Sequence, residues 1–278
     1  MQIFKEKKHL VKHLKTINKG KSIGFVATMG SLHSGHLSLI SSSKSMCCIT
    51  VCSIFINPTQ FNNLDDYKNY PKDYNKDILL LKNIACDILY IPQVNDIYEE
   101  KIESKKYELG KIAENLEGKY RPGHFDGVAT VVDKLFDIVN PSVAFFGEKD
   151  LQQMQVVKKL VSITNRNIDI VGVKTTRESN GLAKSSRNKL LLKEHLQEAS
   201  IIYKCLEYCK LNMHLNIQKL KPYIENQFLQ NQKIQLEYIE FVELNTFDKI
   251  NEWGEKKTNA VCIAAYINNV RLIDNIIL

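Results

Sequence analysis

Short apolar segments rich in β-branched residues alternate with segments of helical periodicity over the first 174 residues. This alternation predicts a parallel sheet with right-handed crossovers and helices on both of its faces. Strands are expected at 23–27, 47–56, 88–91, 143–146 and 168–173. The fold class that follows is α/β, with a doubly wound, Rossmann-like domain in the N-terminal part of the chain.

The pattern changes after Lys174, where a polar loop precedes two helical segments and three strands. The helices are expected near 193–211 and 217–230, and the strands near 235–244, 259–267 and 270–277. Since 278 residues exceed the usual length of one domain, we predict one domain at 1–174 and a smaller α+β domain at 175–278. No Gly/Ser-rich or Pro-rich stretch separates them, so a short hinge is expected.

The formal net charge of +7 favours an anionic ligand, which is either a nucleic acid or a set of small substrates such as a polyphosphate and a carboxylate. The lysines are scattered among acidic residues, and no basic run alternates with aromatic residues. We therefore expect small anionic substrates and no nucleic-acid partner.

The cysteine pattern and the apolar runs indicate where the protein works. The seven cysteines show no paired metal-ligand spacing and lie mostly in apolar surroundings, as reduced core thiols do. The first eight residues lack the apolar stretch of a signal peptide. The longest apolar runs, near 51–56 and 261–267, fall short of the roughly 20 residues that cross a bilayer. A cytoplasmic protein without a membrane partner is expected.

Ligands of doubly wound sheets bind beyond the carboxyl ends of the strands, so chemistry is expected in the loops that follow the predicted strands. The first such loop, 28–36, places His33 and His36 at the start of a helix, beside Gly30 and Gly35. Helix N-terminal amides and the macrodipole, equivalent to roughly half a positive charge, favour a phosphate there. The alternative is that both histidines are ordinary polar caps.

The loop after the strand 143–146 opens another helix with polar residues. Lys149 can meet phosphate oxygens, Asp150 can accept hydrogen bonds from ribose hydroxyls, and Gln153 can point into the same crevice. The alternative is a helix start that Glu148 or Asp150 caps.

Two amide side chains, Asn57 and Gln60, end the second long strand, where Pro58 stops the ladder. Amides suit the recognition of hydroxyl and carboxylate groups because they add no charge. The alternative is a turn without a ligand.

The loop 180–188, near the predicted domain boundary, carries two hydroxyls and two cations. Arg187 offers a bidentate fork to a phosphate, and Ser185 and Ser186 can donate to the remaining oxygens. We interpret this loop as a mobile phosphate clamp. The alternative is a solvated surface loop.

Together these segments resemble the pantothenate synthetases, also called pantoate–β-alanine ligases. This family belongs to the HxGH nucleotidyltransferases, which include the class I aminoacyl-tRNA synthetases. The resemblance runs over nearly the whole chain, in the segments 28–36, 53–61, 121–128, 146–153, 181–188 and 271–275. The loop around 185–187 is similar to the flexible KMSKS segment of those synthetases.

The resemblance implies an ATP-dependent condensation of (R)-pantoate with β-alanine to pantothenate, through a pantoyl-adenylate, with release of pyrophosphate and AMP. It implies that ATP and pantoate bind to the domain at 1–174 and that the domain at 175–278 carries the clamp loop and a lid. It further implies Mg²⁺ that arrives with ATP, without a metal site built by the protein, and a homodimer.

The resemblance also assigns site residues. Those implied for ATP are Met29, Gly30, Ser31, Leu32, His33, Ser34, Gly35, His36, Gly147, Glu148, Lys149, Asp150, Thr176, Lys184, Ser185, Ser186 and Arg187. The catalytic residues among them are His36, His33, Lys149, Ser185, Ser186 and Arg187. The residues implied to bind pantoate or β-alanine are Gln60, Gln153 and Asn57. His36 is the expected proton donor, Gly147 and Asp150 hold the ribose, and the backbone of Met29 and Thr176 contacts the nucleotide.

Some residues depart from the family pattern. Lys184 stands where a small or apolar residue is usual, and Ala27 and Asn180 replace the usual Pro and Asp. An extra cation beside the polyphosphate can alter ATP affinity or the dynamics of the loop.

Two rival functions stay open. One is another HxGH nucleotidyltransferase that acts on a phosphorylated alcohol, although such a substrate would require more cations than the amide pair Gln60 and Gln153 provides. The other is a nucleic-acid-binding protein that uses the positive charge.

Overall fold

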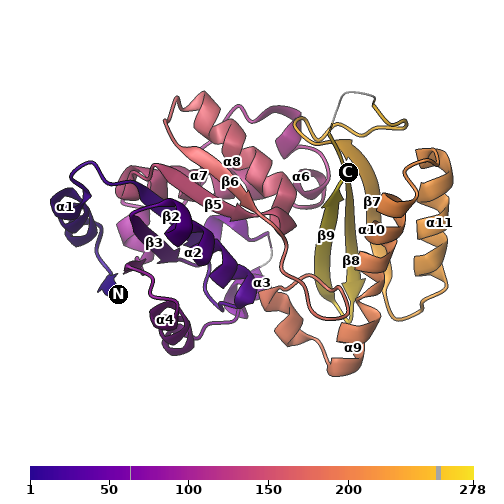
Figure 1. Ribbon diagram of the computed structural model, residues 1–278, viewed down its shortest axis with the longest axis horizontal. Coiled ribbons are helices and arrows are strands. Elements are labelled where there is room, and N and C mark those ends of the chain that lie inside the picture. Colours follow the sequence, from indigo (N-terminus) through magenta and orange to yellow (C-terminus); the bar gives the residue numbers. More distant parts are fainter. Residues whose placement is uncertain (63, 255–257) are drawn as a thin grey trace. The chain divides into compact units, whose positions relative to one another are not determined.

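The computed structural model describes residues 1–62, 64–254 and 258–278. The chain divides into two compact units (Figure 1), one made of Met1–Gly147 and Gln153–Val173 and the other of Glu148–Gln152 and Lys174–Leu278. The first unit is α/β with a parallel sheet, and the second combines helices with an antiparallel sheet, which confirms the predicted fold class. The functional division at 1–174 and 175–278 stays a prediction.

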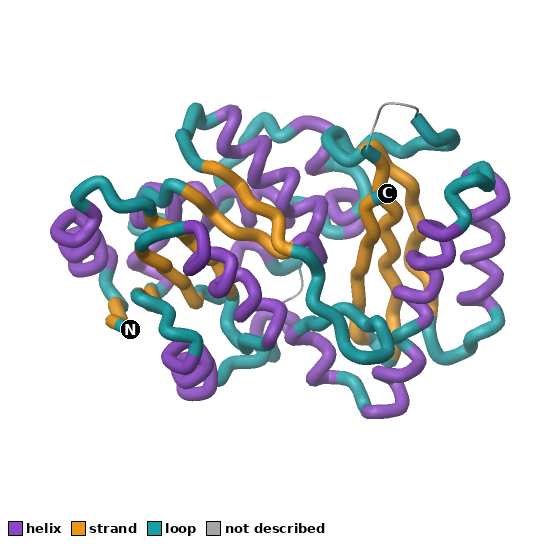
Figure 2. Tube along the Cα trace, in the orientation of Figure 1, coloured by secondary structure: helices purple, strands orange, loops and turns teal. Residues whose placement is uncertain are grey.

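The sheet of the first unit has the strand order β1-β4-β3-β2-β5-β6. Its strands are β1 (Gln2–Phe4), β2 (Ile23–Thr28), β3 (Ile49–Ile54), β4 (Ile88–Tyr90), β5 (Val143–Gly147) and β6 (Asp169–Val173). Neighbours in this order pair in parallel, and Figure 2 shows the strands side by side. Parallel pairing requires crossover connections, which helices supply here.

Helices cover both faces of this sheet. Phe25 of β2 packs edge-on against Phe136 of α7 (His124–Val139), with ring centroids 6.3 Å apart. The next residue, Val26, belongs to a core cluster with Leu39 and Ile40 of α2 (Ser34–Met46). Successive residues of a strand point to opposite faces, so α2 and α7 lie on opposite sides of the sheet.

The remaining helices complete the first unit. They are α1 (Lys7–Asn18), α3 (Leu64–Lys68), α4 (Tyr74–Asn83), α5 (Val94–Ile97), α6 (Glu117–Tyr120), most of α8 (Leu151–Ile163), and the 3₁₀ helices η1 (Pro58–Gln60) and η2 (Gly110–Ala113). In the described part of the chain, no helix is long and apolar enough to cross a membrane.

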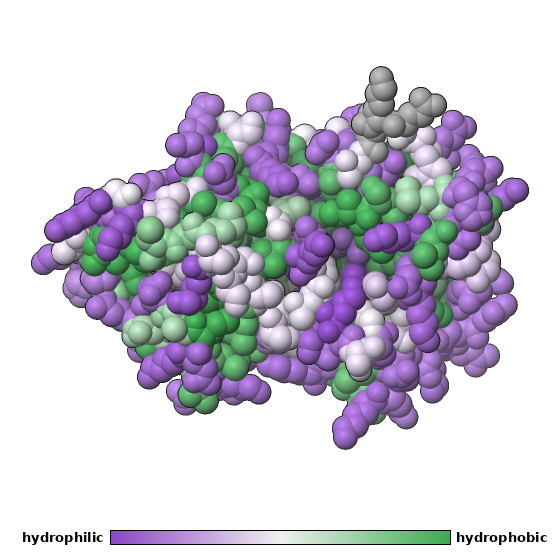
Figure 3. Space-filling view, viewed as in Figure 1, coloured by the Kyte–Doolittle hydropathy of each residue, from purple (hydrophilic) through white to green (hydrophobic). Residues whose placement is uncertain are grey.

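The second unit packs helices on an antiparallel sheet of order β7-β8-β9. Leu206 of α10 and Ile224 of α11 share a core cluster with Val261 and Ile263 of β8. Hydrophilic side chains predominate over α11 in Figure 3, as expected for an amphipathic helix. The elements of this unit are η3 (Glu148–Asp150), η4 (Ser186–Leu190), α9 (Lys193–Glu198), α10 (Ile201–Leu211), α11 (Ile217–Leu229), β7 (Gln235–Glu243), β8 (Asn259–Ile267) and β9 (Val270–Ile277).

Some element boundaries differ from the prediction. The strand expected at 47–56 is shorter, because the Cys47 amide donates to the Ser43 carbonyl at 2.8 Å and closes the last turn of α2. The helix expected at 193–211 is divided into α9 and α10, since the Ser200 hydroxyl donates to the Gln197 carbonyl at 2.6 Å at the break. β1 was not expected.

All seven cysteines are free thiols. Those that are buried, as predicted for core thiols, are Cys52, Cys86, Cys205, Cys209 and Cys262. Burial raises the pKa of Cys205 and of Cys209 to about 12. The core prediction is wrong for Cys48, which is exposed, whereas Cys47 is half-buried.

Candidate active site

The strand order of the first unit reverses at β2. From β2 the sheet continues through β3 and β4 on one side, and β5 then pairs on the other side. Such a reversal leaves a crevice beyond the carboxyl ends of the two strands that flank it, and ligands of doubly wound sheets bind there. The loop after β2 and Gly147 at the end of β5 therefore border the expected site.

Protein groups already engage the backbone amides of the loop after β2. Gly30 and Ser31 have positive φ values of 82° and 52°. The Gly30 amide donates to Thr28 Oγ1 at 3.2 Å, and the amides of Ser31 and Leu32 donate to the two carboxylate oxygens of Asp77, on α4, at 2.8 and 2.7 Å. These three amides therefore have acceptors within the protein, and the binding of a phosphate at the start of α2 stays a prediction.

His33 and His36 form a reciprocal cap at the start of α2. The Gly35 amide donates to His33 Nδ1 at 3.1 Å, and the His33 amide donates to His36 Nδ1 at 3.3 Å. A backbone N–H can only donate, so both Nδ1 atoms accept and each neutral ring carries its proton on Nε2. The capping interpretation is confirmed. The same contacts give each ring an Nε2–H donor of the kind that a phosphate oxygen accepts.

Asn57 is fully buried before η1, and the protein uses its whole amide. Asn57 Oδ1 accepts from Thr59 N at 3.4 Å and from Tyr98 Oη at 2.6 Å. Asn57 Nδ2 donates to Gly127 O at 3.1 Å and to Gln60 Oε1 at 3.2 Å. Both amide protons and both lone pairs are therefore engaged. Asn57 thus supports its neighbours, and its role as a ligand of the substrate stays a prediction.

Gln60 lies at the end of η1 and is 8% exposed. Its Nε2 donates to Met29 Sδ at 2.7 Å, and its main-chain carbonyl accepts from His124 Nδ1 at 2.9 Å. The amide of Gln60 therefore lies beside Met29, whose backbone was predicted to contact the nucleotide. Gln153 is half-buried on α8, and among the described residues no hydrogen bond joins it to Gln60.

Gly127 allows α7 to approach η1 closely. A Cβ atom at this position would lie 2.4 Å from Thr59 O and 2.8 Å from Gln60 Cα. Only glycine fits such an approach of two backbones. The contact brings the Gly127 carbonyl to Asn57 and the ring of His124 to Gln60.

In the second unit, the predicted phosphate-binding residues around Lys149 form η3. Asn275 Nδ2 donates to the carbonyls of Glu148 and Lys149 at 2.9 and 2.8 Å, which fixes this short segment against β9. Lys149 Nζ lies 3.5 Å from Asp150 Oδ1, and the Asp150 side chain is about half exposed. The side chains of Lys149 and Asp150 thus project from an anchored backbone.

Arg177 anchors the start of the predicted clamp loop. Its guanidinium donates to Asp274 Oδ2 and Oδ1 at 2.5 and 3.2 Å and to the Gly181 carbonyl at 3.1 Å. It also lies 4.1 Å from the ring centroid of Tyr203. This bidentate pair with the buried Asp274, together with the stacked ring of Tyr203, holds this side of the loop in one geometry.

The departure at Lys184 has a partner inside the same loop. Lys184 Nζ pairs with Glu178 Oε2 at 2.9 Å, and the Lys184 amide donates to the Thr176 carbonyl at 2.9 Å. The charge that Lys184 adds is therefore balanced locally. Thr176, whose backbone was predicted to contact adenine, uses its carbonyl for the loop.

Ser185, Ser186 and Arg187 form the start of η4. Ser185 Oγ accepts from the Arg187 amide at 3.2 Å, and Ser186 is 6% exposed. The structure thus shows a capped turn at this point of the loop, and the mobility of the loop stays a prediction. The role of this turn as a phosphate clamp stays a prediction.

Asp77 and Tyr98 are site residues that the sequence did not indicate. Asp77 is bonded to Leu32, 45 positions away, and Tyr98 to Asn57, 41 positions away, so no local pattern relates them to the site. Over the described ranges, no group of three His, Cys, Asp or Glu side chains is close enough to hold a metal ion.

Comparison with known sequences finds a family match along nearly the whole chain. The model of the family described as pantoate-beta-alanine ligase matches residues 2–277. A pantothenate synthetase of Christiangramia forsetii is 42% identical over 281 residues, covering 100% of this chain and 99% of that protein. A pantothenate synthetase of Flavobacterium psychrophilum is 43% identical over 279 residues, covering 99% of each chain.

Solved structures agree in fold. The pantothenate synthetase of Thermus thermophilus superposes with a TM-score of 0.92 at 33% identity, over 99% of each chain. The pantoate-beta-alanine ligase of Francisella tularensis, complexed with beta-gamma ATP and beta-alanine, superposes with a TM-score of 0.84 at 38% identity. The superposition covers 99% of this chain and 97% of that one.

Proposed function

This chain belongs to the pantoate–β-alanine ligase family, a family of enzymes of pantothenate biosynthesis, and we propose that it joins (R)-pantoate to β-alanine in two steps with ATP. In the first step the pantoate carboxylate attacks the α-phosphorus of ATP, and pyrophosphate leaves. In the second step the amine of β-alanine attacks the acyl carbon of the pantoyl-adenylate. AMP leaves with the electrons of the broken bond, and the amine loses a proton.

The paired imidazoles of His33 and His36 are the observation that carries this proposal. Pantoate is already ionised at neutral pH, so the first step requires positioning and charge stabilisation more than a base. Both rings keep Nε2–H as a donor because their Nδ1 atoms accept backbone amides. We assign His36 as the donor to the charge that develops on the phosphate oxygens, and His33 as its partner.

Further residues are assigned to the nucleotide. We assign Lys149, Ser185, Ser186 and Arg187 to the phosphates, and Asp150 to the ribose. A Cβ atom at Gly147 would meet no atom of the described residues within 4 Å, so packing does not demand glycine there. A ribose that closely approaches the end of β5 would account for it.

Magnesium fits the site as an ion that arrives with ATP. The described residues offer imidazoles and cations to a polyphosphate and gather no cage of carboxylates. Mg²⁺ would supply neutralisation of the charge on the polyphosphate. The Francisella protein, complexed with beta-gamma ATP and beta-alanine, supports the assignment of these small molecules as substrates.

A hydroxy acid suits the amide of Gln60 better than a phosphorylated alcohol does. Gln60 is a neutral hydrogen-bonding group, and its side chain is buried. Such a group binds a hydroxyl or carboxylate oxygen, whereas a phosphate would favour cations. We assign Gln60 and Gln153 to pantoate.

We also place the enzyme in the cytoplasm, where ATP is available and free thiols stay reduced. We further assign it a homodimeric form.

The proposal is tested by pyrophosphate release. We expect the protein to release pyrophosphate from ATP when pantoate alone is present, and to form AMP and pantothenate once β-alanine is added. Pyrophosphate release that does not depend on pantoate would contradict the proposed reaction. Salt-dependent binding of a nucleic acid without ATP turnover would favour the nucleic-acid alternative.

A further inference from the structure

A chain of hydrogen bonds with a fixed direction runs from Tyr98 through Asn57 to Gln60. Backbone groups set its direction, because they cannot exchange the roles of donor and acceptor. The amide of Thr59 only donates, which identifies the Asn57 atom beside it as Oδ1. The carbonyl of Gly127 only accepts, which identifies the other atom as Nδ2. The amide of Asn57 therefore has one orientation.

The same direction passes on to Gln60. Asn57 Nδ2 donates to Gln60 Oε1 at 3.2 Å, so Gln60 Nε2 points the other way, to Met29 Sδ. A thioether is a weak acceptor, and a carboxylate or hydroxyl oxygen is a stronger one. The side chain of Gln60 therefore presents a donor toward Met29, and an incoming oxygen can replace the sulfur as its partner.

Tyr98 makes the shortest bond in this chain. Its hydroxyl donates to Asn57 Oδ1 at 2.6 Å, whereas the amide and the hydroxyl of Thr59 lie 3.4 and 3.2 Å from the same oxygen. Tyr98 is 4% exposed, and burial raises its pKa, so the hydroxyl stays protonated near neutral pH. Without this hydroxyl, Asn57 would keep only the two longer contacts at Oδ1.

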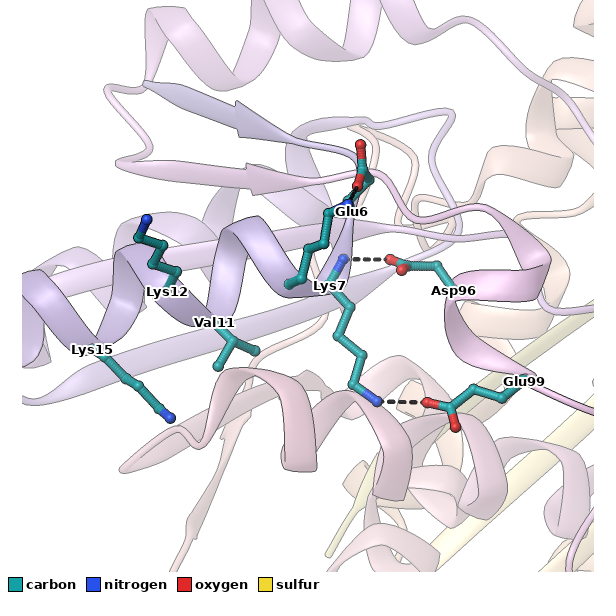
Figure 4. Close-up of a pocket in the computed structure, with 8 residues that line it drawn as sticks. Glu6, Lys7, Val11, Lys12, Lys15, Asp96 and Glu99 are labelled. Atoms are coloured by element: carbon teal, nitrogen blue, oxygen red, sulfur yellow. Dashed lines mark hydrogen bonds and ion pairs between the residues drawn. The ribbon is translucent and has the colours of Figure 1, made fainter.

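The segment around Tyr98 is held from outside by the first turn of α1. The Lys7 amide donates to Asp96 Oδ2 at 2.7 Å, and Lys7 Nζ pairs with Glu99 Oε1 at 2.9 Å. Figure 4 shows both carboxylates pointing to Lys7 at a surface cavity of about 630 Å³. The contacts of Asp96 and Glu99 with Lys7 thus restrain the backbone on either side of Tyr98.

We infer that Tyr98 is a positioning residue for the hydroxy acid. Backbone groups orient the Asn57 amide, and the short bond from Tyr98 holds that amide against Gln60 Oε1, which keeps Gln60 Nε2 toward the substrate. The inference rests on the proposed function and deepens it. Tyr98 touches no reacting atom. Its hydroxyl is expected to affect the affinity for pantoate and to leave the affinity for ATP unchanged.

Replacement of the hydroxyl alone tests the inference. For Tyr98→Phe we expect the KM for pantoate to rise about tenfold, which is the order expected for loss of one hydrogen bond, with an unchanged KM for ATP. The matched control is Tyr107→Phe, whose lost hydroxyl donates to Asp133 Oδ2 at 2.8 Å. This control is expected to keep both KM values, and thermal unfolding shows whether both variants are folded.

A double-mutant cycle distinguishes positioning through Gln60 from a general structural role. If Tyr98 acts through Gln60, then Tyr98→Phe leaves the KM for pantoate unchanged in a Gln60→Met background. An equal increase in both backgrounds, or no increase in the otherwise native enzyme, would overturn the inference while the proposed function stands. A native enzyme without pantoate-dependent pyrophosphate release would overturn both.

Discussion

At the scale of the residue, each site imidazole has two nitrogens with different tasks. The backbone around α2 engages Nδ1 of His33 and of His36, and Nε2–H is the donor that we assign to the phosphates. Removal of a whole ring would abolish both the cap, which is worth about 1 kcal/mol, and the donor. A substitution that keeps an acceptor at the position of Nδ1 and removes the Nε2–H donor separates the effect of the cap from the effect of the donor.

For His36→Asn we expect the cap to remain, because the side-chain oxygen of asparagine can take the place of Nδ1. Loss of the Nε2–H donor is expected to lower turnover roughly 10²-fold or more, as it does for groups that stabilise developing charge. Pyrophosphate release measures turnover, and thermal unfolding measures the cap. His36→Ala, which loses both groups, serves as the comparison. Near-normal adenylate formation in either variant would rule out the proposed role of His36.

The cysteines allow a prediction about reactivity. Hydrogen bonds with Ser22 lower the pKa of the exposed Cys48 thiol, whereas burial raises the pKa of Cys205 and of Cys209 to about 12. A lower pKa gives more of the reactive thiolate at mildly alkaline pH. With limiting iodoacetamide at pH 8, we therefore expect Cys48 to be alkylated first, as measured by peptide mass spectrometry. Cys48→Ser is the control, and early labelling of Cys205 would contradict the prediction.

At the scale of the element, the loop between β2 and α2 depends on α4. Asp77 is 1% exposed and accepts the amides of Ser31 and Leu32. These bonds fix the turn that precedes His33. α4 therefore contributes to the site through Asp77, although none of its residues was predicted to be a site residue.

For Asp77→Asn we expect a loss of about 1–3 kcal/mol of unfolding free energy, because one acceptor becomes a donor that faces a backbone amide. Turnover is expected to fall as well, since the turn before His33 loosens. The control is Asp73→Asn at the N-cap of the same helix, where asparagine caps the Lys76 amide as well as aspartate does. Urea unfolding and pyrophosphate release measure the two effects. Equal behaviour of both variants would contradict the positional role of Asp77.

The sequence pattern was sufficient to predict most helices and strands, and also those site residues that are neighbours in the sequence. The strands expected at 259–267 and 270–277 coincide with β8 and β9, because both are short runs rich in β-branched residues on either side of the turn residues Asn268 and Asn269. β1 spans only Gln2–Phe4, which is too short for a periodic signal. His33 and His36 are neighbours in sequence and were predictable, whereas Asp77 and Tyr98 depend on contacts that only the folded chain creates.

At the scale of the whole molecule, the proposed homodimer can be tested by mass. The chain has a mass of 32.0 kDa, so light scattering after gel filtration is expected to give about twice that value. A tightly associated dimer would keep this mass on dilution. A mass of one chain at every concentration would contradict the homodimer, and it would leave the proposed reaction to be judged by the pyrophosphate assay alone.

The chain passes between its two compact units after Gly147, after Gln152 and after Val173. The short segment 148–152 belongs to the second unit, where Asn275 holds the carbonyls of Glu148 and Lys149. Two separate segments of the sequence, 148–152 and 174–278, therefore make up the second unit, and recombination between related genes can separate them. A single crossover near 174 would combine Lys149 from one parent with Asn275 from the other, so chimeras of this family should work best when both pieces come from the same parent.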